Sequence, residues 1–317
     1  MKTKIYNTLY GAIIGDALGV PVEFHSREEL KRYPVYDMLA YGTFNLPKGS
    51  WSDDSSMMLC FADSIGKSKG IDFNDIMQRF WKWFRHSKYT PDHKTFDVGR
   101  TCHAAIINFH HGINPLDCGL KTEQDNGNGS LMRIAPLPFY LFKMFGENAM
   151  DNKEVFDLIH NVSRLTHAHN ISLIGCDIYC SLMIEILKGT KKEALQGYAL
   201  PKIGAYVNAH PEFREARLKY ERIFHLNFKD LPEKQIRSSG YIVDTLEAAL
   251  WCFLNTDNYR DCVLKAVNLG HDADTVACVA GSIAGLYYRE VPDDWKSAIR
   301  NKKLVDKVIK KFSVVVL

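Results

Sequence analysis

The sequence of 317 residues contains no Cys-x-x-Cys pair, although eight cysteines are scattered along it. Several of them fall inside apolar helical patterns, which is typical of buried free thiols in a reducing compartment. The absence of clustered cysteines argues against a structural zinc site. We therefore expect a cytoplasmic protein without a disulfide framework.

Long apolar runs and charge of one sign are also lacking. No stretch reaches the roughly 20 apolar residues that a membrane span requires. The segment MKTKIYNTLYGAIIGDALG places two lysines before an apolar stretch, but Asn7 and Asp16 interrupt it. We expect it to be part of the mature structure and not a signal peptide. The net charge of +3 comes without a basic block, so neither a nucleic-acid groove nor an electrostatic membrane anchor is expected.

Strand-like alternation is the third feature that the sequence lacks. No convincing period of two and no hairpin dipeptide between strand-like runs is present. Apolar residues recur instead at helical spacing, as they do in IDFNDIMQRFWKWF (residues 71–84). The run from Ile171 to Leu187 is apolar nearly all round, which indicates a central buried helix. The sequence therefore predicts an all-α protein.

No linker rich in proline, serine or glycine divides the chain, so residues 1–317 are predicted to form one domain. The stretch from about 190 to 240 is more polar and less periodic than the rest. We expect this stretch to be an insertion or a segment that covers the core.

Glycine recurs every fourth residue in two of the expected helices. Gly11, Gly15 and Gly19 do so in the first, and Gly281 and Gly285 in a late one. Glycine inside a helix lowers stability by about 0.5–1 kcal/mol relative to alanine. Glycines repeated at this spacing are usually explained by close packing of two helix backbones. We therefore expect the first and the late helix to pack against each other at short range.

The stretch GSWSDDSSMM (residues 49–58) places Asp53 and Asp54 among serine hydroxyls, directly before an apolar run. Such residues are typical of a helix N-terminus, where Ser52 or Asp53 would cap the first turn. The same residues offer hard oxygen ligands for a cation. Taken alone, this stretch favours the helix cap.

A second stretch, NLGHDADTVACVAG (residues 268–281), repeats the arrangement. Asp272, Asp274 and Thr275 stand just before another apolar helix. At a junction of loop and helix their side chains can converge on one point. Two such junctions suit two hard divalent cations that share ligands, and the all-oxygen set points to Mg²⁺, Mn²⁺ or Ca²⁺ and not to zinc.

A third stretch is DNGNGSLMRIAPLPF (residues 125–139). Its glycines would let backbone N–H groups approach a phosphate. The glycines can also belong to a plain loop, in which they adopt the backbone angles of turns. Taken alone, the stretch favours the plain loop. Arg133 is either a phosphate contact or part of a buried ion pair that supports the loop. Glu23, Asp97 and His167 would not be selected from the residues alone.

The combination of motifs is similar to that of the ADP-ribosylglycohydrolases. GAIIGDALGVPVEF, GSWSDDSSMM, FDVGRT, GNGSLMRIAP, LTHAHN and GHDADTVACVAGSIAGLYY occur in that family's order, from about residue 8 to 290. The chain resembles the dinitrogenase-reductase-activating glycohydrolase type. The resemblance implies a compact, single-domain orthogonal helical bundle with a binuclear centre of two Mg²⁺ or Mn²⁺ ions at the bottom of a cleft.

The resemblance also implies roles for individual residues. The implied metal ligands are Ser52, Asp53, Asp54, Asp272, Asp274 and Thr275. The implied catalytic residues are Glu23, near the metals, and Asp97, on the scissile side of the substrate. The implied ADP-ribose contacts are Gly99, Gly127, Asn128, Gly129, Ser130, Met132 and His167. Ser52 and Ser55 stand where the family usually has threonines, and a serine hydroxyl ligates a cation equally well.

The activity implied by the resemblance is hydrolysis of the glycosidic bond of ADP-ribose conjugates. Arginine on an ADP-ribosylated protein is the first expectation, because Asp97 could hold a guanidinium. ADP-ribosyl-serine, poly(ADP-ribose) and O-acetyl-ADP-ribose, a small ADP-ribose-containing molecule, are alternatives. A nucleotide phosphoesterase and a non-catalytic crystallin-like or ADP-ribose-binding protein are weaker ones. A monomer that binds neither membrane nor nucleic acid is expected.

Overall fold

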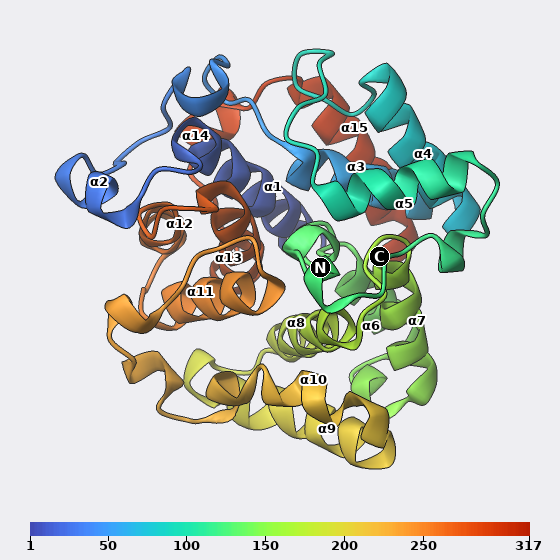
Figure 1. Cartoon of the computed structure of the whole chain (residues 1–317). Coiled ribbons are helices and arrows are strands. Elements are labelled where there is room, and N and C mark those ends of the chain that lie inside the picture. Colours follow the sequence, from blue (N-terminus) through green and yellow to red (C-terminus); the bar gives the residue numbers. More distant parts are fainter.

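The computed structural model describes residues 1–317 and is built almost wholly from helices (Figure 1). Apart from isolated bridges such as that between Gly127 and Tyr241, it contains no β-structure. The α-helices are α1 (Lys2–Gly19), α2 (Arg27–Arg32), α3 (Asp53–Ser68), α4 (Phe73–His86), α5 (Arg100–His110), α6 (Leu137–Phe145), α7 (Lys153–Arg164), α8 (Asn170–Lys188), α9 (Leu195–Ala209), α10 (Arg214–Leu218), α11 (Ile242–Leu254), α12 (Tyr259–Val267), α13 (Ala273–Tyr288), α14 (Asp293–Ala298) and α15 (Lys302–Val316). The predicted all-α class is confirmed.

Helices α1 and α13 pack with their backbones in contact, as the glycine spacing predicted. A Cβ atom added to Gly11 would lie 2.3 Å from the carbonyl oxygen of Gly281, and one added to Gly281 would lie 2.2 Å from that of Gly11. At Gly15 the added atom would lie 2.0 Å from the Ala277 oxygen. These distances leave room for hydrogen only, so glycine is required along this line.

The contact between α1 and α13 extends to the end that carries acidic residues. A Cβ atom on Gly19, the last residue of α1, would lie 2.2 Å from the Cα of Asp274 in the first turn of α13. The chain leaves α1 through a short 3-10 turn, η1 (Val20–Val22), and reaches Glu23 directly. The C-terminal end of α1 and the N-terminal end of α13 therefore deliver Glu23 and Asp274 to the same place.

Helix α8 lies inside the bundle, as the apolar run from Ile171 to Leu187 predicted (Figure 1). It is long and apolar enough to cross a membrane by length and composition, with a mean hydropathy of 1.5, and 94% of that apolar window is buried in the protein. It packs against α7, α9, α11 and α13. The polar stretch from about 190 to 240 contains α9, which lies along α8, followed by short helical turns.

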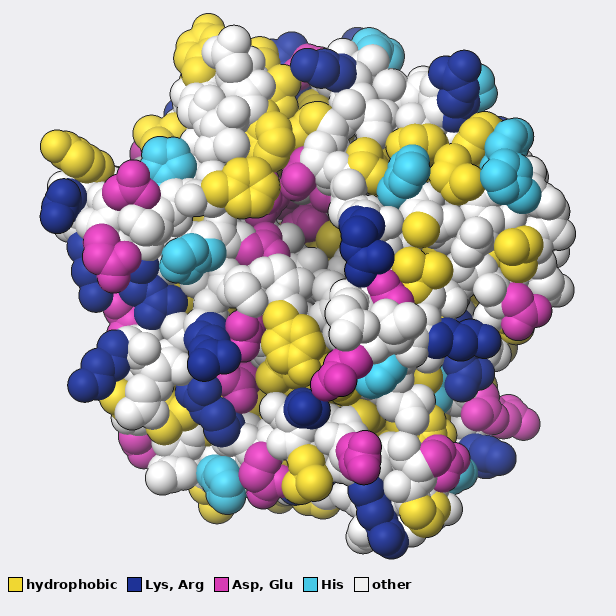
Figure 2. Space-filling view, viewed as in Figure 1, with side chains coloured by type: hydrophobic (Ala, Val, Ile, Leu, Met, Phe, Trp, Pro, Cys, Tyr) yellow, Lys and Arg dark blue, Asp and Glu magenta, His cyan; other side chains and the backbone are white.

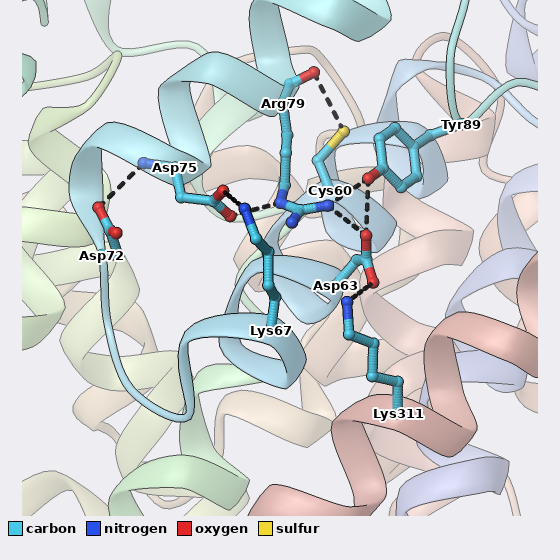
Figure 3. Close-up of polar contacts among 8 residues, drawn as sticks. All are labelled: Cys60, Asp63, Lys67, Asp72, Asp75, Arg79, Tyr89 and Lys311. Carbon is cyan, nitrogen blue, oxygen red and sulfur yellow. Dashed lines mark hydrogen bonds and ion pairs between the residues drawn. The ribbon is translucent and has the colours of Figure 1, made fainter.

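A polar network ties α3 to its neighbours (Figure 3). Arg79 of α4 is 8% exposed, donates to Asp75 at 2.6 Å and pairs with Asp63 of α3. Asp63 also accepts from the Tyr89 hydroxyl at 2.7 Å and from Lys311 of α15 at 2.8 Å. These contacts join α4 and α15 to α3, the helix whose first turn carries Asp53 and Asp54.

Replacing Gly281 by alanine tests the backbone contact. We expect Gly281→Ala to lower the free energy of unfolding by at least about 2 kcal/mol, because the new methyl group meets a carbonyl and forces α1 and α13 apart. Gly204→Ala in α9 is the matched control, since nothing lies within 4 Å of its added Cβ. It should raise stability by about 0.5–1 kcal/mol. Urea denaturation measures both, and equal effects would contradict the proposed contact.

Removing the central cation tests the polar network. We expect Arg79→Met to cost about 2–4 kcal/mol of stability, because it leaves the carboxylates of Asp63 and Asp75 poorly compensated in a mostly buried place. Lys67→Met is the control, because Lys67 also pairs with Asp75 but its side chain is 62% exposed. Its cost should stay below about 1 kcal/mol in the same denaturation experiment. A small loss in both variants would show that the network contributes little.

Candidate active site and metal centre

One cleft of about 310 Å³ opens between the first turns of α3, α5 and α13. Figure 2 shows it as a hollow whose floor is magenta with carboxylates. Its lining residues are Glu23, Asp53, Asp54, Asp97, Gly99, Arg100, Thr101, Cys102, Gln124, Gly127, Asn128, Gly129, Met132, His167, Gly240, Asp272 and Thr275. All are polar or small except Met132 and Cys102, so the cleft suits a polar, hydroxyl-rich ligand.

The first acidic segment is a helix start, as its sequence suggested. Ser52 is the N-cap of α3, and its hydroxyl accepts from the backbone N–H of Asp54 at 3.3 Å. Asp16 of α1 is fully buried and accepts from the backbone N–H groups of Ser52 and Ser55, the former at 2.9 Å. No pattern in the sequence indicated this role of Asp16. Its carboxylate fixes the turn that aims Asp53 and Asp54 into the cleft.

The second acidic segment is clamped to the backbone around Glu23. The Phe24 N–H donates to the His271 carbonyl, and the His271 N–H donates to the His25 carbonyl, both at 2.7 Å. Phe24 and His271 have φ values of 67° and 60°, a left-handed conformation that bulky residues rarely adopt. Backbone strain of this kind concentrates at functional sites. The clamp holds Glu23 beside Asp272, the residue before α13.

The two segments meet in a carboxylate cluster. The ligand oxygens of Glu23, Asp272 and Asp274 lie within 4.8 Å of one another. The hydroxyl of Thr275 donates to Asp54 at 3.3 Å and thereby joins α13 to α3. One carboxylate oxygen on each of Glu23, Asp54 and Asp274 is buried without a hydrogen-bond partner. Buried polar atoms are nearly always paired, so these oxygens point to a missing ligand.

No lysine, arginine or histidine forms an ion pair with the carboxylates of the cleft floor. Arg100 lines the cleft, but its guanidinium pairs with Asp125 at 2.7 Å. Burial raises the pKa of Glu23 to about 10, and the charge of Asp97 adds to the shift. Burial also raises the pKa of Asp97 to about 6, with a further contribution from Asp272. The pKa values of Asp53, Asp54 and Asp274 are raised well above their usual range, chiefly by burial.

The donor set fits a hard divalent cation. The three side chains that come within ligand distance of one another, Glu23, Asp272 and Asp274, are all carboxylates, whereas Cys102 and His167 line the cleft outside this group. Mg²⁺, Mn²⁺ and Ca²⁺ take such ligands, and a cation would supply the positive charge that the unpaired oxygens lack. Glu23, Asp272 and Asp274 could hold one ion, and Asp53 and Asp54 with Thr275 could contribute to a second.

The glycine loop before α6 includes the 3-10 turn η5 (Asn128–Ser130) and forms a second wall. The Asn128 amide donates to Asp272 at 2.7 Å and to Thr245 at 2.9 Å, so Asn128 positions the acidic cluster. The sequence had suggested only a contact with ADP-ribose. Arg133 is buried and donates to the carbonyls of Gly129 and Val162. It therefore supports the loop from behind through carbonyls and not through the ion pair that the sequence suggested, and it does not line the cleft as a phosphate contact would.

His167 lies beside the glycine loop and is 2% exposed. Its Nδ1 is 2.7 Å from the Thr166 hydroxyl, and its Nε2 would lie 3.5 Å from a Cβ on Gly127. Burial lowers its pKa to about 3, with a smaller contribution from Arg133. A neutral ring therefore faces the cleft, which can hydrogen-bond a ligand but carries no charge.

The third wall is the start of α5. Gly99 is its N-cap, and Asp97, with φ of 51°, lies two residues earlier. The cap has no side-chain hydrogen bond, so the first N–H groups of the helix are free to face a ligand. Arg100, Thr101, Cys102 and Gln124 line the cleft here and were not singled out from the sequence. Arg100, Thr101 and Cys102 follow Asp97 closely in the sequence, and this short spacing is the only signal that could have suggested them as cleft residues.

The structure brings together nearly all of the residues that the sequence suggested. All but three line the cleft. Asp274 lies beneath the surface in the carboxylate cluster. Ser52 caps α3, and Ser130 is buried with its hydroxyl 3.6 Å from the Cys176 sulfur. Neither serine reaches the cleft surface.

Comparison with known proteins agrees with this arrangement. The ADP-ribosylglycohydrolase family matches residues 1–316. The chain belongs to the ADP-ribosylglycohydrolases, which are enzymes that hydrolyse glycosidic bonds. The ADP-ribosylarginine hydrolase Tri1 of Serratia proteamaculans (strain 568) is 32% identical over 299 residues, covering 92% of this chain and 74% of the relative.

Two further relatives agree with this assignment. The ADP-ribosyl-(dinitrogen reductase) glycohydrolase of Rhodospirillum rubrum is 28% identical over 297 residues, covering 92% of this chain and 88% of the relative. A solved ADP-ribosylglycohydrolase-related protein complex superposes with a TM-score of 0.78 at 29% identity, over 100% of this chain and 99% of the other. The resemblance inferred from the motifs is confirmed, and it extends over the whole chain.

The pH dependence of stability tests the carboxylate cluster as a cation site. The pKa values of Asp97 and Glu23 are raised in the folded, metal-free protein. Above about pH 4 the folded protein therefore keeps protons that the unfolded chain has released, and its stability falls as the pH rises. The melting temperature in chelator should therefore fall between about pH 5 and about pH 8. Added Mg²⁺ or Mn²⁺ should raise it by several degrees near pH 8 and little near pH 5, since protons compete with the cation. Identical melting curves with metal and with chelator near pH 8 would contradict a cation site.

Proposed function

We propose that this ADP-ribosylglycohydrolase releases ADP-ribose from ADP-ribosylated arginine side chains of proteins, and that the reaction depends on two divalent cations. The observation that carries the proposal is the floor of the cleft. It holds carboxylates without ion-pair partners, beside a glycine loop and an uncapped helix start. The name of the Serratia relative, an ADP-ribosylarginine hydrolase, supports arginine as the group that leaves.

Two sets of oxygen ligands support two cations. Glu23, Asp272 and Asp274 form one set, and Asp53 and Asp54, with Thr275 beside them, form the other. Such ions, when bound, orient the ribose hydroxyls and the water that hydrolysis consumes. Asn128 and Asp16 hold these ligands in place, because each of them hydrogen-bonds a ligand or the turn that carries it. Mg²⁺ and Mn²⁺ are the ions we expect.

Hydrolysis of this bond adds water across it. The water oxygen bonds to C1″ of the distal ribose, the bond from C1″ to the guanidinium nitrogen breaks, and the freed guanidine takes up a proton. The transition state resembles an oxocarbenium ion and carries positive charge on the ribose. Carboxylates fixed around the ribose stabilise that charge in advance of the reaction.

Glu23 and Asp97 have separate tasks in this proposal. Asp97 is held near the head of α5 by a left-handed backbone, and its carboxylate would bind the guanidinium by charge-assisted hydrogen bonds. Glu23 belongs to the three-carboxylate set on the cleft floor, and positive charge bound beside it would keep it ionised. It is placed to accept the proton of the attacking water.

Release of ADP-ribose from an ADP-ribosylarginine protein tests the proposal. We expect release with Mg²⁺ or Mn²⁺, none in chelator, and a kcat/KM at least about 100-fold lower in Asp54→Asn, because one ligand oxygen is lost. Asp257→Asn is the matched control, because that side chain is 99% exposed and lies outside the cleft. It should keep the wild-type rate.

The products identify which part of the proposal fails. Release that persists in chelator would contradict the metal centre. Cleavage of a serine conjugate alone would contradict arginine as the leaving group. Products that carry a split pyrophosphate, such as AMP, would contradict glycosidic hydrolysis.

A further inference from the structure

Three phenylalanines form a continuous aromatic cluster next to two cleft-lining carboxylates, Glu23 and Asp97, and we name this cluster the aromatic rim: Phe24, Phe44 and Phe96. The ring centroids of Phe24 and Phe44 are 6.2 Å apart and edge-to-face, and those of Phe44 and Phe96 are 5.0 Å apart. None of the three lines the acidic floor. In Figure 2 hydrophobic side chains border the hollow on its upper left.

Two residues of the rim are adjacent in sequence to the carboxylates Glu23 and Asp97. Phe24 follows Glu23, and Phe96 precedes Asp97. The Thr43 hydroxyl donates to the Glu23 carbonyl at 2.7 Å, which ties the turn carrying Phe44 to Glu23. The rings are therefore held next to Glu23 and Asp97, on the side of the cleft that these two carboxylates line.

Core packing does not explain Phe24. Its side chain is 66% exposed, and it stands in a left-handed conformation with φ of 67°. A bulky residue in the left-handed region is strained, and burial of the Phe24 side chain does not offset this strain. The hydrogen bond from its N–H to His271 keeps the backbone in place. The fixed backbone thus presents the ring to solvent beside Glu23.

The chemistry of the rim and floor together suits a cation on an aliphatic stem. Ring faces carry negative electrostatic potential and attract a guanidinium, and the flat guanidinium also stacks on them. Methylene groups pack on the same rings. Carboxylates on one side and aromatic faces on the other leave no complementary partner for a neutral, short aglycone such as serine.

We propose that the aromatic rim is the aglycone subsite and selects the guanidinium and aliphatic stem of the ADP-ribosylated arginine side chain. This inference rests on the proposed function and adds residues that determine its specificity. The rim binds the part of the substrate that leaves and makes no contact with the ADP-ribose that stays.

Steady-state kinetics of Phe24→Leu and Phe24→Trp test the inference. Leucine is also a bulky residue, so the backbone strain at this position stays similar; it keeps an apolar surface but removes the ring. Tryptophan keeps an aromatic face. For an ADP-ribosylarginine peptide, Phe24→Leu should raise KM about threefold to tenfold with kcat within about twofold. Phe24→Trp should retain the wild-type KM. The inhibition constant of free ADP-ribose should be unchanged in both.

Tyr198→Leu is the matched control, because Tyr198 is 61% exposed and lies on α9, none of whose residues lines the cleft. It should leave every constant unchanged. An unaltered KM in Phe24→Leu would overturn the inference while the proposed function stands. An equal loss of ADP-ribose binding would also overturn it, because the rim would then contact the nucleotide. A wild-type protein that releases no ADP-ribose from arginine would refute the proposed function itself.

Discussion

The backbone contact between α1 and α13 sets the position of the acidic cluster. The glycines along it admit no side-chain atom, since an added Cβ would lie 2.0–2.3 Å from backbone atoms of the other helix. At one end of the contact Gly19 lies against Asp274, and the chain reaches Glu23 four residues after Gly19. The close backbone packing of α1 on α13 thus ends at the acidic cluster. A small separation of the two helices would move ligands on both sides of the cluster.

Burying carboxylates without cations opposes folding, because each charged form loses its hydration. The raised pKa values of Glu23, Asp53, Asp54 and Asp274 express that cost. A continuous core of 97 buried residues and networks such as the one around Arg79 stabilise the fold against it. The site is therefore preorganised for positive charge. The proposed cations would supply that charge at the floor of the cleft, and the proposed guanidinium would supply it beside Asp97.

Much of this arrangement could be predicted from the sequence. Helical periodicity identified the all-α class and the buried α8, and glycine spacing predicted the packing of α1 on α13. Acidic residues at the starts of two helices suggested the carboxylate cluster. The resemblance to the ADP-ribosylglycohydrolases was needed to add Glu23 and Asp97. Asp16, Arg100 and the link from Asn128 to Asp272 were missed, because they act through contacts between distant segments. The aromatic rim was missed for the same reason, since its rings come from three separate loops.

We propose that the carboxylate cluster binds divalent cations. A titration with Mn²⁺, following the free ion by electron paramagnetic resonance, tests this without any substrate. We expect two Mn²⁺ ions per chain in the wild type and loss of at least one in Asp272→Asn, because Asp272 belongs to the three-carboxylate set. A chain that binds no Mn²⁺ near neutral pH, or an Asp272→Asn variant that still binds two ions with unchanged affinity, would contradict it.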